Sequence, residues 1–371
     1  MGSHSAAVHL ASLRLRDFRN YARADLAIGP GFHLLLGSNA QGKTNLLEAV
    51  YLLATLRSFR GVGGAQLVRR EARGYFFGGT SVGQGTHELK AYWSPRERRL
   101  SVDGHPVRRL ADFLGFFRAV VFCTEDLQLV KGAARGRRRF LDLLLSQTQP
   151  GYLEVLLRYT QVLRHRNALL KHPGGDLDAL ESFTAQLVDL GGRLMQARRE
   201  LLPRLLPLAR QAHRRISQEA EELHLDYAPA VRGDFAVELA RARPREIALR
   251  MTLLGPHRDD LQLLLDGQPA AQFGSEGQKR SLVLALKMAQ AEYLAAVHGT
   301  MPALLLDDVM GELDVRRRSG LLPLLQHSHR QGGQVLMTCT EENWPRDLGL
   351  DLVRWQVENG AVTRREGAPH P

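Results

Sequence analysis

An octapeptide in the first part of the chain reads Gly37-Ser38-Asn39-Ala40-Gln41-Gly42-Lys43-Thr44. It fits the pattern G-x-x-x-x-G-K-[ST] at every defined position. An apolar run at residues 32–36 comes before it, and an apolar-periodic segment at residues 43–53 follows. Strand, glycine loop and helix in this order form the context in which the pattern binds nucleotide phosphates. The sequence therefore predicts a P-loop.

The residue types in this loop suit a bound triphosphate. Glycines let successive backbone N–H groups turn inward around an anion, and the following helix directs its positive end at the same phosphates. We expect Lys43 to reach the β- and γ-phosphates and the Thr44 hydroxyl to bind Mg²⁺. The predicted ATP contacts are Gly37, Ser38, Asn39, Ala40, Gln41, Gly42, Lys43 and Thr44.

A second apolar run ends in two carboxylates and reads Pro302-Ala303-Leu304-Leu305-Leu306-Asp307-Asp308. A buried strand that places a carboxylate at its C-terminal edge suits a Mg²⁺ ligand beside a P-loop. We expect Asp307 to bind the metal, directly or through water. Asp308 is expected to orient or deprotonate the attacking water. The alternative is that both aspartates merely cap the next helix.

A third segment, Phe273-Gly274-Ser275-Glu276-Gly277-Gln278, precedes a long predicted helix. A hydroxyl and free N–H groups at a helix start can hold a phosphate, although an ordinary serine N-cap has the same pattern. The order of P-loop, this segment and the aspartate-ending strand resembles the ABC/SMC class of ATPases. That resemblance implies that Ser275, Gly277 and Gln278 bind the γ-phosphate held by the opposite protomer. It also implies a dimer-contact loop at Gly311-Glu312-Leu313-Asp314.

Four further stretches narrow the resemblance. They read Leu13-Arg14-Leu15-Arg16-Asp17-Phe18-Arg19-Asn20-Tyr21, Thr44-Asn45-Leu46-Leu47-Glu48-Ala49, Arg137-Arg138-Arg139-Phe140-Leu141-Asp142 and Gly255-Pro256-His257-Arg258-Asp259-Asp260-Leu261. Together they closely resemble the RecF family of bacterial recombination-mediator ATPases, over roughly residues 10–360.

The resemblance implies an α/β fold. It would be an ABC-type ATPase head, with a mixed sheet, a P-loop helix and an antiparallel β subdomain, joined to a mostly helical second lobe without a long coiled coil. The expected domains are residues 1–130 and 250–371 for the two halves of the ATPase and 131–249 for the helical lobe. Turn signals at residues 103–104 and 266–267 predict hairpins, and 191–192 are expected to interrupt the helices.

The resemblance also implies a function in DNA replication, recombination and repair and in the SOS response to DNA damage. It implies slow, DNA-stimulated, Mg²⁺-dependent ATP hydrolysis and an ATP-dependent homodimer. The implied partners are double-stranded DNA, gapped or single-to-double-strand junction DNA, and RecR and RecO, with which the protein would load recombinase. An SMC-like structural DNA clamp with little ATP turnover is the alternative.

Several positions depart from the ABC pattern. Asp308 stands where these enzymes usually have glutamate, so slow hydrolysis is expected. Glu125 and Gln128 are candidates for the loop that senses the γ-phosphate. Thr338 and Thr340 lie where many relatives keep a switch histidine. The residue that signals hydrolysis therefore stays open. Gly311 occupies a position that is often serine, so the dimer contact at residues 311–314 stays open as well.

The chain carries 50 Lys and Arg against 39 Asp and Glu, a net charge of +11, which favours a polyanionic partner. No base-reading motif is visible, so binding through DNA phosphates is expected. A solvated helix face, or packing against neighbouring acids, is the alternative for each basic group. The candidate DNA contacts are Arg57, Arg60, Lys131, Arg135, Arg137, Arg138 and Arg139.

The remaining observations restrict the class of protein. The two cysteines, Cys123 and Cys339, cannot form a disulfide framework and are expected to be buried thiols. We expect His257 to be a hydrogen-bonded structural residue and Arg258 to pair with Asp259. No apolar run suits a membrane helix and no signal peptide is visible, so a cytoplasmic protein without a membrane partner is expected. Residues 1–4 look like an expression tag.

Overall fold

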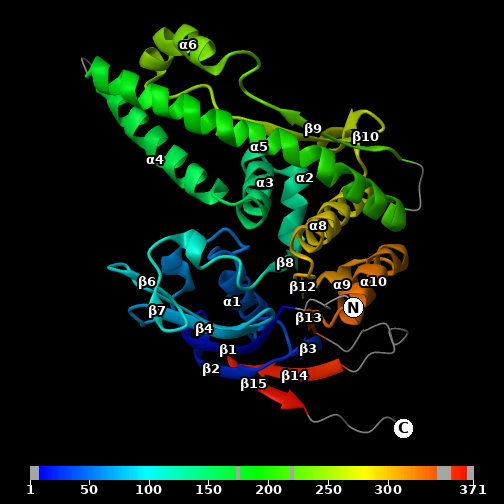
Figure 1. Cartoon of the computed structure of the whole chain (residues 1–371). Coiled ribbons are helices and arrows are strands. Elements are labelled where there is room, and N and C mark those ends of the chain that lie inside the picture. Colours follow the sequence, from blue (N-terminus) through cyan, green and yellow to red (C-terminus); the bar gives the residue numbers. More distant parts are fainter. Residues whose placement is uncertain (1–7, 173–175, 218–220, 341–351, 366–371) are drawn as a thin grey trace. The chain divides into compact units, whose positions relative to one another are not determined.

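The computed structural model describes residues 8–172, 176–217, 221–340 and 352–365 (Figure 1). Two compact units are present. Unit 1 comprises Met1–Asp126, Arg215–Gln218 and Leu284–Pro371, and unit 2 comprises Leu127–Arg214 and Glu219–Val283. Each unit is described by itself.

One sheet of unit 1 is antiparallel throughout and has the strand order β2-β1-β4-β5-β6-β7. Leu13 and Leu15 of β1 are fully buried, as apolar residues two positions apart on one face of a strand should be. Leu10 is fully buried too, and the pairing of β1 with β4 shifts its register between Leu10 and Ser12. The predicted antiparallel β subdomain is therefore confirmed. Its strands are β1 (His9–Phe18), β2 (Tyr21–Ala27), β4 (Tyr75–Val82), β5 (Thr86–Trp93), β6 (Arg98–Val102) and β7 (His105–Pro106).

The other sheet of unit 1 is mixed, with the order β15-β14-β3-β13-β12-β8. The strands β14, β3, β13, β12 and β8 run parallel to one another, and β15 is antiparallel to β14. Every residue of β8, β12 and β13 is buried, as expected for parallel strands covered on both faces. The strands are β3 (Gly31–Leu36), β8 (Ala119–Phe122), β12 (Ala303–Asp307), β13 (Gln334–Cys339), β14 (Leu352–Glu358) and β15 (Ala361–Arg365).

Helices cover this mixed sheet. α1 (Lys43–Thr55) contacts β8, β12 and β13, and α10 (Val315–Arg330) contacts β13. Because β3, β12, β13 and β8 are parallel, their carboxyl ends meet at one edge of the sheet, where ligands of such sheets bind. The shorter elements of the chain are η1 (Gly64–Leu67), η2 (Leu110–Asp112), η3 (Thr124–Leu127) and α9 (Val309–Glu312).

Unit 2 is mostly helical, as predicted, and contains a small antiparallel sheet of order β11-β10-β9. α8 (Glu276–His298) begins in this unit and ends in unit 1. The other elements are α2 (Gln128–Lys131), α3 (Ala134–Thr148), α4 (Tyr152–Lys171), α5 (Leu177–Ser217), β9 (Leu223–Ala228), α6 (Phe235–Leu249), β10 (Asp260–Leu265), β11 (Gln268–Pro269) and α7 (Ala270–Phe273).

Two features of unit 2 differ from the expectation. α5 runs through Gly191 and Gly192 without a break. A Cβ on Gly191 would lie 2.7 Å from the ring of Phe235, so this glycine serves close packing and does not end the helix. Residues 250–283 group with the helical unit instead of the ATPase half, because β10 pairs with β9 along its whole length.

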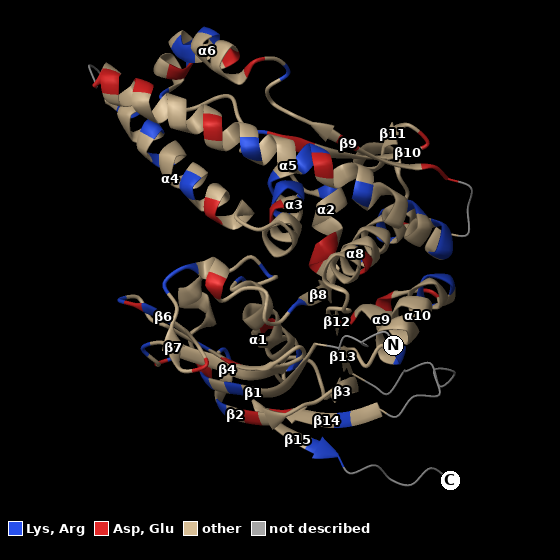
Figure 2. Cartoon of the chain, viewed as in Figure 1, with Lys and Arg blue, Asp and Glu red and all other residues tan. Residues whose placement is uncertain are grey.

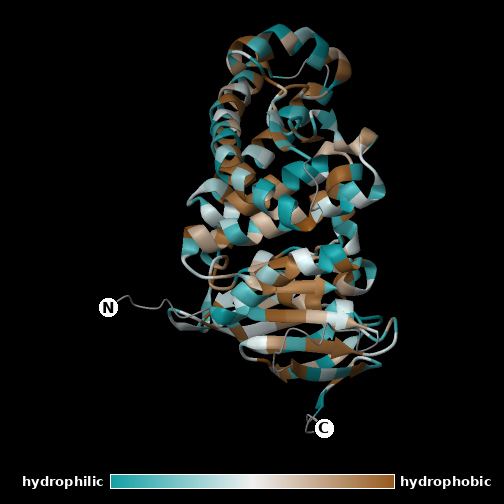
Figure 3. Ribbon diagram, turned by 90° about the vertical axis from the view of Figure 1, so that its right-hand side faces the viewer, coloured by the Kyte–Doolittle hydropathy of each residue, from teal (hydrophilic) through white to brown (hydrophobic). Residues whose placement is uncertain are grey.

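The two predicted hairpin turns are confirmed. Asp103 and Gly104 join β6 to β7, and Asp266 and Gly267 join β10 to β11, all four with positive φ. Apolar residues gather on the strands of unit 1, whereas the helices of unit 2 alternate hydrophobic and hydrophilic positions (Figure 3). Across the described ranges, we find no helix whose length and hydropathy would let it span a bilayer.

Candidate functional site

The P-loop connects β3 to α1, as the sequence predicts. Gly37 and Gly42 have φ values of 153° and 117°, conformations that favour glycine. A Cβ at Gly37 would lie 2.2 Å from the carbonyl oxygen of Val357, and one at Gly42 would lie 2.5 Å from the side-chain nitrogen of Asn20. The backbone and its surroundings thus require glycine at both ends of the loop.

Lys43 folds back into this loop. Its ammonium donates to the carbonyl oxygens of Gly37 at 2.5 Å and Ser38 at 2.9 Å. Burial lowers the pKa of Lys43, and the negative charges of Asp308 and Asp307 oppose that shift. The ammonium therefore lies within electrostatic reach of both predicted catalytic carboxylates.

Asp307 ends β12 beside the first turn of α1. The Thr44 hydroxyl donates to its Oδ1 at 2.8 Å, so the two predicted magnesium ligands lie together. Burial raises the pKa of the Asp307 carboxyl, and the hydrogen bonds from Thr44 and Thr338 act in the opposite direction. A carboxylate next to a hydroxyl supplies oxygen ligands, which Mg²⁺ prefers.

Asp308 takes an unusual backbone conformation at the same edge. Its φ is 56°, and its side chain is exposed. It occupies the N-cap position of α9, yet within the described residues its carboxylate makes no capping hydrogen bond. The capping alternative therefore does not account for Asp308, whose carboxylate is available to solvent where the catalytic water is predicted.

Thr338 contributes more than its sequence position suggested. Its hydroxyl donates to Asp307 Oδ1 at 3.0 Å and accepts from the backbone N–H of Asp308 at 2.8 Å. The register of β12 and β13 pairs Asp307 directly with Thr338. Thr340, the other candidate, is exposed beyond the end of β13.

Two more charged residues belong to this edge of unit 1. Glu125 follows β8, the neighbour of β12, and its negative charge raises the pKa of Asp307. The positive charge of Arg60 lowers it, and the Arg60 guanidinium donates to Asn45 Oδ1 at 3.0 Å. Arg57 is exposed, and Gln128 begins α2 in unit 2.

The Ser275 segment begins α8 in unit 2. The Ser275 hydroxyl accepts from the backbone N–H of Gln278 at 3.2 Å, and the Gln278 side chain accepts from the backbone N–H of Ser275 at 2.6 Å. This reciprocal arrangement is a capping box. Ser275 is exposed, Gly277 is half-buried, and the Gln278 amide also donates to Glu221 at 2.5 Å. A role in phosphate binding stays a prediction.

The basic stretch around α3 is largely occupied by internal partners. The Arg137 guanidinium bonds both carboxylate oxygens of Asp260, at 2.7 and 2.9 Å, and Arg138 donates to the carbonyl oxygen of Asp259 at 2.5 Å. Lys131 pairs with Glu276 at 2.6 Å. Arg137 and Arg138 thus tie α3 to the start of β10, which does not favour the DNA contacts predicted for them. Arg135 and Arg139 are exposed.

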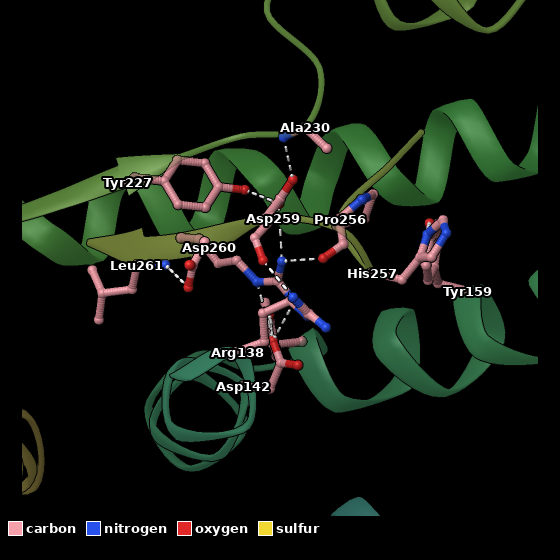
Figure 4. Close-up of polar contacts among 12 residues, drawn as sticks. Arg138, Asp142, Tyr159, Tyr227, Ala230, Pro256, His257, Asp259, Asp260 and Leu261 are labelled. Atoms are coloured by element: carbon pink, nitrogen blue, oxygen red, sulfur yellow. Dashed lines mark hydrogen bonds and ion pairs between the residues drawn. The ribbon is translucent and has the colours of Figure 1, made fainter. Parts of the chain in front are cut away.

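Asp259 lies at the centre of a buried network (Figure 4). Its carboxylate accepts from Arg198 at 3.0 Å, from the backbone N–H of Ala230 at 2.8 Å and from the Tyr227 hydroxyl. Arg198 also bonds Asp142 at 2.8 Å. The predicted Arg258–Asp259 pair is therefore wrong: Asp259 is buried against Arg198, whereas its neighbour Arg258 is exposed.

His257 and the cysteines are structural, as predicted. The Tyr159 hydroxyl lies 2.7 Å from His257 Nδ1, and Nε2 lies 3.3 Å from the carbonyl oxygen of Thr252. Burial lowers the pKa of His257 to about 4, so the ring is neutral at pH 7. Cys123 and Cys339 are free and buried. In the described part of the chain, no cluster of three His, Cys, Asp or Glu side chains could hold a metal.

The chain is similar to known proteins over nearly its full length. No protein-family model matches it. Curated proteins named "DNA replication and repair protein RecF" are 43% identical in Synechococcus sp. (strain JA-2-3B'a(2-13)), covering 90% of this chain and 91% of the relative, and 39% identical in Symbiobacterium thermophilum, covering 94% and 97%.

Solved structures agree. One described as "the recombination mediator protein RecF-ATPrS in RecFOR pathway" is 30% identical, covers 98% of this chain and 100% of that chain, and has a TM-score of 0.87. An Smc head domain derived from Pyrococcus furiosus is 12% identical, covers 96% of each chain and has a TM-score of 0.55, which shows the shared ABC-type fold alone. The chain belongs to the RecF family of DNA replication and repair proteins.

Proposed function

We propose that this protein is a DNA-stimulated ATPase that forms a dimer on ATP binding and acts in recombinational repair in the cytoplasm. The observation that carries the proposal is the convergence of Lys43, Thr44 and Asp307, with the Thr44 hydroxyl 2.8 Å from the Asp307 carboxylate. Relatives named for DNA replication and repair, and solved RecF structures described with ATP and ATPrS, support it.

The roles follow from the geometry of unit 1. Backbone N–H groups of residues 37–44 and the Lys43 ammonium would hold the phosphates. Thr44 and Asp307 would hold Mg²⁺, which neutralises charge on the phosphate oxygens when bound. Asp308 would orient the attacking water and take its proton. Because its carboxylate is one methylene shorter than glutamate, slow turnover is expected.

A second copy of the chain would complete the site. Ser275, Gly277 and Gln278 at the start of α8 would meet the γ-phosphate held by the partner, with residues 311–314 at the dimer contact. Hydrolysis would leave ADP and inorganic phosphate, and departure of that phosphate would remove the group that joins the two copies, so the dimer would open and release DNA. Duplex, gapped and junction DNA, RecR and RecO are the proposed partners, supported by the family and by the RecFOR pathway in which the neighbours are described.

The test combines mass in solution with phosphate release. With ATP and gapped duplex we expect a dimer, and with ADP a monomer. Asp308→Asn should stay dimeric with ATP because hydrolysis stops, and Lys43→Ala should neither dimerise nor release phosphate. A monomer under both nucleotides, for wild type and for Asp308→Asn, rejects the proposed switch.

Turnover separates the ATPase from an SMC-like clamp. Duplex, gapped and single-stranded DNA are each titrated while phosphate release is measured, with Lys43→Ala as the blank. DNA-stimulated release above that blank supports the repair ATPase. DNA binding without stimulated release supports the clamp.

A further inference from the structure

The outer side of the P-loop is held by a turn from the far end of the chain. Asn359 and Gly360 join β14 to β15 with positive φ values of 48° and 76°. The backbone N–H of Asn359 donates to Gln41 Oε1 at 2.7 Å, and that of Gly360 donates to the Gln41 carbonyl oxygen at 3.3 Å. The Gln41 side chain is therefore engaged by the turn.

A second turn holds the same carbonyl group. The Asn20 side chain, between β1 and β2, donates to the Gln41 carbonyl oxygen at 2.9 Å, and its Oδ1 accepts from Asn45 of α1 at 2.8 Å. A Cβ on Gly360 would lie 2.6 Å from the backbone oxygen of Asn20. The two turns thus pack against each other and against Gln41.

These bonds determine which way the loop donors point. In a trans peptide the C=O and the following N–H point in opposite directions. Two donors outside the loop hold the Gln41 C=O outward, so the N–H of Gly42 is directed inward. The Tyr21 hydroxyl does the same one peptide later, donating to the Gly42 carbonyl oxygen at 2.9 Å, which directs the Lys43 N–H.

We propose that Asn20 and the Asn359-Gly360 turn are positioning residues that orient the Gly42 N–H toward a bound nucleotide phosphate. The proposal rests on the ATP binding proposed above. A donor oriented in advance contributes to affinity without being reordered when the ligand binds. Loss of one such bond should weaken ATP binding about tenfold.

The test uses two glycines in equivalent turns. Gly360→Ala introduces a Cβ against Asn20. Gly104→Ala introduces one at the similar φ of 80°, where no described atom lies within 4 Å, so it carries the same backbone strain without the contact. We expect Gly360→Ala to raise the KM for ATP about tenfold over Gly104→Ala, with kcat within about twofold.

A second variant keeps the conclusion independent of turn strain. Asn20→Asp retains the acceptor for Asn45 but replaces the donor to Gln41 by oxygen, and should raise KM about tenfold as well. A purely structural defect would lower the midpoint of unfolding and the fraction of active protein. The measured kcat would then fall at unchanged KM.

Equal KM values for Gly360→Ala, Asn20→Asp and Gly104→Ala would overturn the positioning role. A wild-type protein that neither binds nor hydrolyses ATP would instead contradict the proposed ATPase function itself. The two failures are therefore distinguishable in one set of measurements.

Discussion

At the scale of single residues, the Thr338 hydroxyl joins Asp307, the last residue of β12, to Asp308, which follows it. It donates to the Asp307 carboxylate and accepts from the Asp308 backbone. A hydroxyl that makes both bonds has a fixed direction, so it restricts the rotation of the carboxylate that we assign to Mg²⁺. Groups that orient a metal ligand commonly affect metal affinity although they do not touch the metal.

Thr338→Val should therefore raise the Mg²⁺ concentration needed for half-maximal ATP hydrolysis about 10- to 100-fold. Valine keeps the shape of threonine but lacks the hydroxyl that orients the Asp307 carboxylate. Titrating Mg²⁺ at saturating ATP measures the effect as a higher half-saturating concentration. Thr363→Val, on an exposed position of β15, is the matched control. An unchanged magnesium titration would remove Thr338 from the site.

His33 is expected to make the free energy of unfolding of unit 1 depend on pH. It is fully buried in β3, with Nε2 3.0 Å from the Gly29 carbonyl oxygen, and Nδ1 accepts from the Trp355 indole N–H at 3.2 Å. Burial lowers its pKa to about 4 from 6.5. Between these two values the unfolded chain binds the proton that the folded protein does not, so stability falls as the pH falls.

From pH 7 to pH 5, His33 should account for about 2 kcal/mol of lost unfolding free energy. His33→Gln should lose correspondingly less over this interval, whereas His105→Gln, at an exposed histidine, should follow the wild type. Denaturant unfolding at both pH values measures the difference. Parallel losses in the wild type and in His33→Gln would show that His33 does not titrate in this way.

At the scale of elements, the parts that were predictable from sequence are those with local signals. β3, the P-loop and α1 follow one another in sequence, so an apolar run, a glycine pattern and a helical period suffice. β14 and β15 carry no comparable signal, because their place beside β3 depends on a pairing across most of the chain. The hydrogen bonds from Asn359 and Gly360 to Gln41 are not predictable from sequence for the same reason.

Side-chain partners in unit 2 were equally hard to predict. The segment from Gly255 to Leu261 resembles the RecF family in sequence. That resemblance does not indicate that Asp259 contacts Arg198 or that its neighbour Arg258 is exposed. Arg258 and Asp259 both lie just before β10, where no helix or strand period sets the direction of a side chain, so which of them is buried depends on what packs there. The arginines of α3 were assigned to DNA because their acidic partners are distant in sequence.

The network around Asp259 should dominate the stability of unit 2. Asp259→Ala leaves Arg198 buried with one carboxylate fewer and should lower the free energy of unfolding by about 3–5 kcal/mol. Asp25→Ala removes a carboxylate that pairs with Arg16 and Arg23 at the surface, and should cost less than about 1 kcal/mol. Chemical denaturation measures both, with Asp259→Asn as a milder variant. Equal costs for Asp259→Ala and Asp25→Ala would contradict the structural role.

At the scale of the whole molecule, the net charge of +11 does not identify a binding face by itself. Basic and acidic residues both occur along α4, α5 and α6 (Figure 2). Arg137 pairs with the Asp260 carboxylate, and Arg138 donates to the backbone carbonyl oxygen of Asp259. The proposed phosphate contacts are therefore concentrated on exposed side chains such as Arg57 and Arg135.

Salt dependence can separate these two kinds of arginine. Each arginine that neutralises a DNA phosphate contributes about 0.9 to the slope of log affinity against log salt concentration. Arg135→Gln should lower the slope for duplex binding by about that amount and leave the midpoint of thermal unfolding unchanged. Arg138→Gln, three residues further along α3, should leave the slope unchanged and lower the midpoint, because it removes a bond to the start of β10. If Arg138→Gln instead lowers the slope at an unchanged midpoint, the internal contact is dispensable and Arg138 faces DNA.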